Sequence, residues 1–157
     1  MVKFFGRFNG YCKFGENKWI SNEEISFFTD SAGNRDLGAG LMFKKHWAFF
    51  PWLESWRGKE IMSDITFLKL VPIVLSIFLF RHELANKWIV FHTDDKALVS
   101  IFNKKSSKSR RVIQLLRPFV LQTMIHNMQF KACHIQGNFN CKADASSRKH
   151  FKAFKKL

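Results

Sequence analysis

Three short apolar runs, each ended by turn or charged residues, open the patterned part of the chain. They are ISFFTDSAGN at 25–34, LGAGLMF at 37–43 and HWAFFPW at 46–52. Such runs are typical of strands, so the pattern predicts a three-stranded antiparallel meander. Residues 1–24 show no sustained period and carry scattered glycines, which predicts an irregular lead-in before a domain over 25–157.

The longest apolar stretch, 65–80, follows Ser63 and Asp64, which are plausible helix-capping residues. Because it is too long for an average strand, it predicts a buried helix. Pro72 lies inside this stretch and costs a helix about 3 kcal/mol or more unless the helix begins late or kinks. A membrane-spanning helix needs about 20 predominantly apolar residues, so this shorter stretch, which also contains Lys69, does not predict a membrane span.

Strand and helix patterns alternate in the second half of the chain. The continuous apolar run at 88–91 predicts a strand covered on both faces and paired in parallel. Apolar residues repeat at spacings of three and four over 97–102 and 112–124, which predicts two helices. The segment at 129–135 alternates like a strand, and 143–157 predicts a final basic helix or tail.

The predicted order, β-β-β-α-β-α-α-β-α, indicates an α/β domain. We expect a five-stranded mixed sheet, made of the antiparallel meander plus parallel strands, with helices on both faces. A chain of 157 residues has the length of one domain, and an apolar fraction of 46% is enough for a sizeable core.

The charge of the chain points to an anionic partner. Lys and Arg number 26 against 12 Asp and Glu, a net charge of +14, whereas about 2 to 8 is usual for a small domain. Nucleic acid is the first expectation and an acidic membrane surface the second. Cys12, Cys133 and Cys141 form no C-x-x-C pair and no signal peptide precedes them, which favours an intracellular location, cytoplasmic or nuclear.

Three aspartates stand at the ends of predicted elements rather than on charged helix faces: Asp30, Asp94 and Asp144. If the strands that end at Asp30 and Asp94 are neighbours, these two carboxylates meet at the carboxyl edge of the sheet. Each aspartate alone is explained as a turn former or a helix cap. Together they favour a site for a hard cation, Mg²⁺ or Mn²⁺.

Four segments in this order carry a resemblance to a known family. They are FFTDSAGN at 27–34, DITFLKLVPIVLSI at 64–77, FHTDDKALVSIFNKKSSKSRRVIQLLRP at 91–118 and HIQGNFNCKADASSR at 134–148. The chain from Ile25 to Arg148 resembles the ribonuclease H domain of retrotransposon reverse transcriptases, in particular those of DIRS-like and gypsy-like elements. Residues 1–24 resemble the connector behind a polymerase domain that this chain lacks.

The resemblance implies a ribonuclease H-like fold and two-metal hydrolysis of the RNA strand of an RNA–DNA hybrid. Two Mg²⁺ ions would be held by four carboxylates, and Asp30, Asp94 and Asp144 fill the first, third and fourth places. Lys69 stands in the second place, because this chain reads FLKL where the family reads FLEL. A protonated amine cannot coordinate a metal, so we expect impaired catalysis.

The orientation of Lys69 separates two expectations. If its ammonium points inward, it can neutralise the three aspartates in place of an ion, and the fold survives while catalysis fails. If it swings out to solvent, a single-metal activity is conceivable. A non-enzymatic, basic nucleic-acid-binding module that has kept the fold is the alternative function, and we expect a monomer in either case.

Further residues are candidates for contact with nucleic acid. They are Lys104, Lys105, Lys108, Arg110 and Arg111 in a loop between two predicted helices, together with Asn34, Asn140 and Arg148. A solvated loop and turn formation are the plain explanations. The high net charge favours phosphate contact for the basic loop. A zinc site at Cys133, His134, Cys141 and His126 matches none of the usual ligand spacings.

Overall fold

The computed structural model describes residues 18–25, 27–34 and 37–136. Its elements are β1 (Trp19–Ser21), α2 (Asn22–Ile25), β2 (Phe27–Ser31), β3 (Gly38–Phe43), β4 (His46–Pro51), the 3-10 turns η1 (Glu54–Trp56) and η2 (Glu60–Ser63), α3 (Ile65–Leu84), β5 (Trp88–Thr93), α4 (Lys96–Lys104), α5 (Arg110–Ile125) and β6 (Gln129–His134). From β2 to β6 this order is the predicted one. The predicted helix over 143–157 lies outside the described residues.

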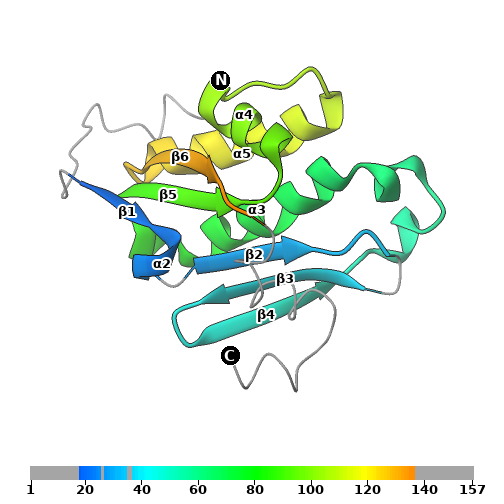
Figure 1. Ribbon diagram of the computed structural model, residues 1–157, viewed down its shortest axis with the longest axis horizontal. Helices are drawn as coiled ribbons and strands as arrows, with labels where there is room; N and C mark the ends of the chain where they lie inside the picture. The colour runs from blue at the N-terminus through cyan, green and yellow to red at the C-terminus, as the bar shows by residue number, and fades with distance from the viewer. Residues whose placement is uncertain (1–17, 26, 35–36, 137–157) are drawn as a thin grey trace.

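The antiparallel meander forms as the sequence pattern predicts. Strands β2, β3 and β4 make one sheet in that order, and β2 pairs with β3 from Phe27↔Phe43 to Ser31↔Ala39. The turn between β3 and β4 places Lys44 in the left-handed region, with φ of 54°. This sheet carries Asp30 one residue before the end of its first strand (Figure 1).

The prediction of one five-stranded sheet was wrong, because the strands divide into two three-stranded sheets. The second sheet has the order β1-β5-β6, and both of its pairings are parallel. Part of the predicted irregular lead-in is therefore a strand, β1, which pairs with the first half of β5 from Trp19↔Trp88 to Ser21↔Val90. The short helix α2 separates β1 from β2, and within the described residues no ladder pairs β2 with β5 (Figure 1).

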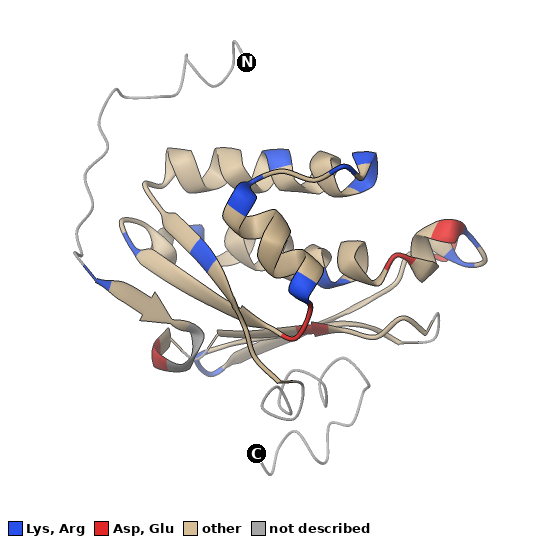
Figure 2. Ribbon diagram, turned by 45° about the horizontal axis from the view of Figure 1, so that its top comes forward, with Lys and Arg blue, Asp and Glu red and all other residues tan. Residues whose placement is uncertain are grey.

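The helices were predicted to lie on both faces of the sheet, but the three long helices of the described chain, α3, α4 and α5, lie on the same side of the sheets (Figure 2). Phe91 of β5 faces them, and its ring contacts Phe102 of α4 and Phe119 of α5, with centroids 5.8 and 6.4 Å apart. Phe27 of β2 packs edge-on against Phe91 at 5.6 Å. These rings join the two sheets into one core, and the abundance of Phe in the composition serves that purpose.

Helix α3 runs through the centre of this core and is longer than the sequence pattern predicts. It continues across Pro72 to Leu84, with a non-helical residue at Phe80 (φ −108°, ψ 16°). Asp64 begins it by accepting a hydrogen bond from the Phe67 backbone N–H at 3.0 Å, as expected of a cap. By length and a mean hydropathy of 1.7 it would also fit a membrane span, but half of that stretch is buried within the protein, as in the core helix of a globular domain.

Helix α4 is fixed at both ends by side-chain hydrogen bonds. Asp95 caps its start by accepting from the backbone N–H groups of Ala97 and Leu98, at 2.8 and 3.1 Å. Near its end, Asn103 donates to the Ala132 carbonyl at 3.0 Å and accepts from the Ala132 N–H at 2.8 Å. The amide of Asn103 thereby ties α4 to β6.

Candidate functional site

Three elements bring two carboxylates and one amine to the same place. Asp30 is the fourth residue of β2, Lys69 is in the second turn of α3, and Asp94 directly follows β5. The sequence predicted that Asp30 and Asp94 meet at the end of neighbouring strands. Both carboxylates contact the same Lys69 amine, although no strand ladder pairs β2 with β5 in the described part of the chain. We call Asp30, Lys69 and Asp94 the acid–lysine cluster.

The amine of Lys69 points inward and contacts both carboxylates. Its Nζ donates to Asp94 Oδ1 at 2.5 Å and lies 3.9 Å from Asp30 Oδ1. The exposed fractions of the side chains are 15% for Lys69, 9% for Asp30 and 31% for Asp94. The expectation of an inward-pointing lysine therefore matches the geometry, and the solvent-exposed orientation does not.

The charges of the acid–lysine cluster nearly balance. Two carboxylates and one ammonium leave a formal charge of −1 in a partly buried pocket, where charge interactions are stronger than in water. Without the amine, two like charges would face each other with little water to screen them. The ammonium of Lys69 thus offsets part of the repulsion between the carboxylates of Asp30 and Asp94.

The described members of this cluster do not fit a two-ion metal centre. Within residues 18–25, 27–34 and 37–136, no three His, Cys, Asp or Glu side chains are grouped so that they could hold a metal ion. An ammonium group donates hydrogen bonds and offers no lone pair, so Lys69 cannot replace an oxygen ligand while it is protonated. Asp144, the fourth expected ligand, lies outside the described residues.

Hydrogen bonds from neighbouring residues hold the three elements together. Thr66, on the first turn of α3, donates to Asp95 Oδ2 at 2.9 Å, which links the start of α3 to the start of α4. Trp52 donates from Nε1 to the carbonyl of Ala32 at 2.8 Å, just beyond the end of β2. Ser31 donates from Oγ to the carbonyl of Leu68 at 2.7 Å. Sequence reasoning singled out none of these three contacts, because each joins residues that are distant along the chain.

Asp94 and Asp95 have separate roles although they are adjacent. Asp94 meets Lys69, whereas Asp95 caps α4 and accepts a hydrogen bond from Thr66. The choice of Asp94 as the site residue follows from where α4 begins, since the cap position is the residue just before Lys96.

The basic loop between α4 and α5 lies at the surface, and both of its ends carry Lys or Arg (Figure 2). Lys104, Lys105, Lys108 and Arg110 are exposed. Lys105 also lies over the ring of Phe130 at 5.3 Å from its centroid, and Arg111 pairs with Glu60 of η2 at 2.9 Å. These two contacts orient part of the loop and leave Lys104, Lys108 and Arg110 facing solvent.

The remaining candidates divide between described and undescribed residues. Asn34 is exposed in the turn between β2 and β3, where its carbonyl accepts from the Leu37 N–H at 3.1 Å. His134 is exposed at the end of β6. Asn140, Arg148 and Cys141 lie outside the described residues, so the structure does not test them.

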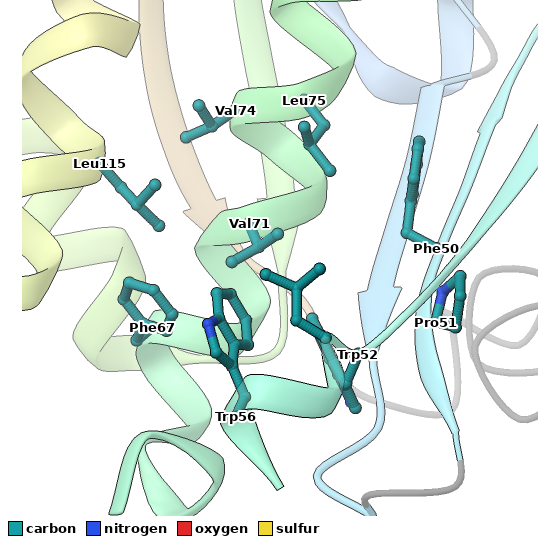
Figure 3. A pocket seen from close by; sticks show the side chains of 10 residues that line it. Phe50, Pro51, Trp52, Trp56, Phe67, Val71, Val74, Leu75 and Leu115 are labelled. Atoms are coloured by element: carbon teal, nitrogen blue, oxygen red, sulfur yellow. The ribbon is translucent and has the colours of Figure 1, made fainter. Parts of the chain in front are cut away.

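The lining of an apolar cavity of about 350 Å³ includes none of the three residues of the acid–lysine cluster (Figure 3). Its walls come from the end of β4, from η1, and from α3 and α5: Phe50, Pro51, Trp52, Leu53, Trp56, Phe67, Val71, Val74, Leu75 and Leu115. None of these side chains can transfer a proton or bind a metal. Trp52 is only 5% exposed and stacks on Trp56 at 5.9 Å, so it is part of the core and not a surface on which bases could stack.

Comparison with known proteins identifies the fold. No protein-family model matches the sequence, and neither does any curated protein. Among solved structures, the chain is similar to LC11-RNase H1, isolated from compost by a metagenomic approach, with a TM-score of 0.54 and 13% sequence identity. The match covers 80% of this chain and 95% of that protein. The chain therefore has a ribonuclease H-like α/β fold, in agreement with the fold that the motifs predicted.

Proposed function

We propose that this chain is a ribonuclease H-like domain, derived from a retroelement reverse transcriptase, that binds nucleic acid and whose hydrolysis of RNA–DNA hybrids is impaired. The observation that carries the proposal is the 2.5 Å contact between Lys69 Nζ and Asp94 Oδ1. Retroelement ancestry is inferred from the four sequence segments, and the likeness to a solved RNase H1 supports the fold on which they lie.

Impaired hydrolysis follows from the chemistry of position 69. A divalent cation at Asp30 and Asp94 would have to approach an ammonium that already offsets part of their charge, and it would gain no ligand from that side chain. Mg²⁺ keeps several of its waters and is usually held by one or two carboxylates, but here the Asp94 carboxylate already accepts a hydrogen bond from the Lys69 ammonium. The domain is therefore proposed to bind its substrate class without turning it over.

Binding is proposed to depend on charge and on the shape of the duplex rather than on base sequence. The net charge of +14 attracts the phosphate backbone, and Lys104, Lys108 and Arg110 are exposed to make contacts with it. An RNA–DNA hybrid offers 2′-hydroxyls and an A-like groove, which proteins read mainly by shape. A hybrid or another duplex is thus the expected partner.

A cleavage assay with three proteins tests the catalytic half of the proposal. The unmodified chain, Lys69→Glu and Lys69→Gln are incubated with a labelled RNA–DNA hybrid in Mg²⁺ and, separately, in Mn²⁺. We expect cleavage only by Lys69→Glu, because that variant alone gains an oxygen-rich anionic ligand, while Lys69→Gln controls for loss of the amine. Equal cleavage by the unmodified chain and Lys69→Glu would refute impairment. If no variant cleaves, Lys69 is not the sole cause, and the non-enzymatic module is favoured.

A binding measurement tests the other half. The affinity for a hybrid should fall as salt rises, and each phosphate contact contributes about 0.9 to the logarithmic slope on duplex DNA. Changing Lys104, Lys108 and Arg110 to Ala should weaken binding and flatten this slope. Lys45→Ala, on the exposed turn between β3 and β4, is the matched control. An affinity that does not change with salt would count against the basic loop as an interface.

A further inference from the structure

A proline in the middle of α3 leaves one backbone carbonyl of the helix without its usual partner. In an α-helix the N–H of residue 72 would donate to the carbonyl of residue 68, but Pro72 has no N–H. The helix nevertheless continues from Ile65 to Leu84. Both Leu68 and Pro72 are buried, so water does not readily replace the missing donor, and such a carbonyl would be costly to leave unpaired.

The missing donor is supplied by a strand. Ser31, only 4% exposed at the end of β2, donates from Oγ to the Leu68 carbonyl at 2.7 Å. Ser31 directly follows Asp30, and Leu68 directly precedes Lys69. The hydrogen bond therefore joins the immediate neighbours of two members of the acid–lysine cluster.

We propose that Ser31 and Pro72 form a positioning device, in which Pro72 frees the Leu68 carbonyl and Ser31 occupies it, so that residue 69 is held against Asp30. The proline makes the Leu68 carbonyl depend on Ser31, because an ordinary residue at position 72 would supply an N–H of its own to that carbonyl. Ser31 and Pro72 act as positioning residues, since neither belongs to the acid–lysine cluster itself.

This inference deepens the proposed function, since it concerns the cluster on which that proposal rests. Its test measures the unfolding equilibrium and the Lys69 side-chain NMR resonances in protein without nucleic acid or metal. A failure of the cleavage or binding experiments would therefore leave it standing, and a failure here would leave those experiments unaffected.

A double-mutant cycle separates the device from an ordinary buried hydrogen bond. Ser31→Ala in the unmodified background leaves the Leu68 carbonyl buried without a donor, so the unfolding equilibrium constant should rise roughly tenfold. In the Pro72→Ala background the new N–H can satisfy that carbonyl, and the same serine change should have a several-fold smaller effect. Thr123→Val removes the hydrogen bond from Thr123 Oγ1 to the Val120 carbonyl in α5, and its effect should be equal in both backgrounds.

Lysine side-chain NMR supplies the readout that stability alone does not give. The Lys69 resonances are assigned by their loss in Lys69→Met. Ser31→Ala should move them toward those of exposed lysines, and the double variant with Pro72→Ala should keep that displacement although its stability recovers. Stability and the Lys69 resonance should respond differently because the N–H that Pro72→Ala introduces can bond the Leu68 carbonyl but does not restore the hydrogen bond between α3 and β2.

Two results would overturn the inference. One is a Ser31→Ala effect on stability that is equal with proline or alanine at position 72. The other is a Lys69 resonance that does not move when Ser31 is changed. If Ser31→Ala does not fold, folding of the double variant supports the device, and failure of both to fold overturns it.

Discussion

Two lysine–carboxylate pairs anchor the two ends of α3, and they differ in burial rather than in distance. Near the start of the helix, Lys69 Nζ lies 2.5 Å from Asp94 Oδ1, with side chains 15% and 31% exposed. Near its end, Glu83 Oε2 accepts from Lys44 Nζ at 2.6 Å, with side chains 46% and 56% exposed. The N–O distance alone would rank these pairs as equals.

Their surroundings give them different consequences. Water and salt screen the Lys44–Glu83 pair, and exposed pairs of this kind contribute about 0 to 1 kcal/mol. Removing one partner of a buried pair is costly because it leaves an uncompensated charge in a poorly solvated place. Only the first pair therefore constrains α3, since replacing Lys69 changes the charge of a partly buried site.

The largest expected effect comes from Lys69→Met, which keeps most of the length of the side chain and removes its charge. Asp30 and Asp94 would then lose the ammonium that contacts both of them, and the free energy of unfolding should fall by about 3 kcal/mol, at the lower end of the range for breaking a buried pair. Urea denaturation at neutral pH measures this. A loss below about 1 kcal/mol would show that the pair behaves as a surface contact.

Asp95→Ala should have the next largest effect. Asp95 contacts α3 through the neutral hydroxyl of Thr66, whereas Asp94 contacts it through the charged amine of Lys69, so the two variants separate a neutral contact from a charged one. The change removes the cap of α4 and the acceptor of Thr66, so the free energy of unfolding should fall by about 1–2 kcal/mol. Asp94→Asn is the matched neighbouring variant. If Asp95→Ala displaced the Lys69 side-chain resonances as strongly as Asp94→Asn does, the separate roles of the two aspartates would be contradicted.

Lys44→Met should lower the free energy of unfolding by less than about 1 kcal/mol, because its charge is largely solvated before and after the change. Raising the ionic strength from about 0.01 to 1 M shortens the screening length from about 30 to 3 Å and should remove most of this difference. The same salt series should change the effect of Lys69→Met much less. Denaturation at both salt concentrations checks both statements, and equal salt dependence would contradict the comparison.

The smallest effect concerns the far end of α3, where the His82 ring packs edge-on against His126 at 5.3 Å. Burial, followed by the charges of His82 and Arg81, lowers the pKa of His126 below its ordinary 6.5. Since the unfolded chain then binds protons more readily, the contribution to stability is complete above pH 6.5 and is lost as the pH falls through the lowered pKa. The urea midpoint should therefore drop more between pH 7 and pH 5 in the unmodified chain than in His126→Gln. An equal drop in both would rule out His126 as its source.

The fold could be predicted from the sequence wherever a pattern was long enough to be periodic. Asp64 as the cap of α3, the apolar start of β5 and the alternating segment of β6 all depend on nearby residues. Strand β1 has only three residues, too few to show a period, and its pairing with β5 is a tertiary contact. The division into two sheets therefore could not be predicted.

The candidate site was predictable in its members and not in its geometry. Asp30 and Asp94 stood out by their place at element ends and by the family resemblance, and Lys69 stood out by the resemblance alone. The direction of the Lys69 side chain depends on how α3 sits on β2, which is set by contacts such as Ser31 to the Leu68 carbonyl. No local signal along the sequence specifies such a contact.

The Asn103 amide should reduce aggregation of this protein at high concentration, because it bonds the backbone of strand β6. In the described part of the chain β6 is an outer strand of its sheet, and such strands can act as templates for intermolecular cross-β growth. By bonding both the N–H and the carbonyl of Ala132, Asn103 occupies the middle of that template. These two hydrogen bonds leave the N–H and carbonyl of Ala132 less available to pair with a strand of another copy, which should disfavour fibril formation.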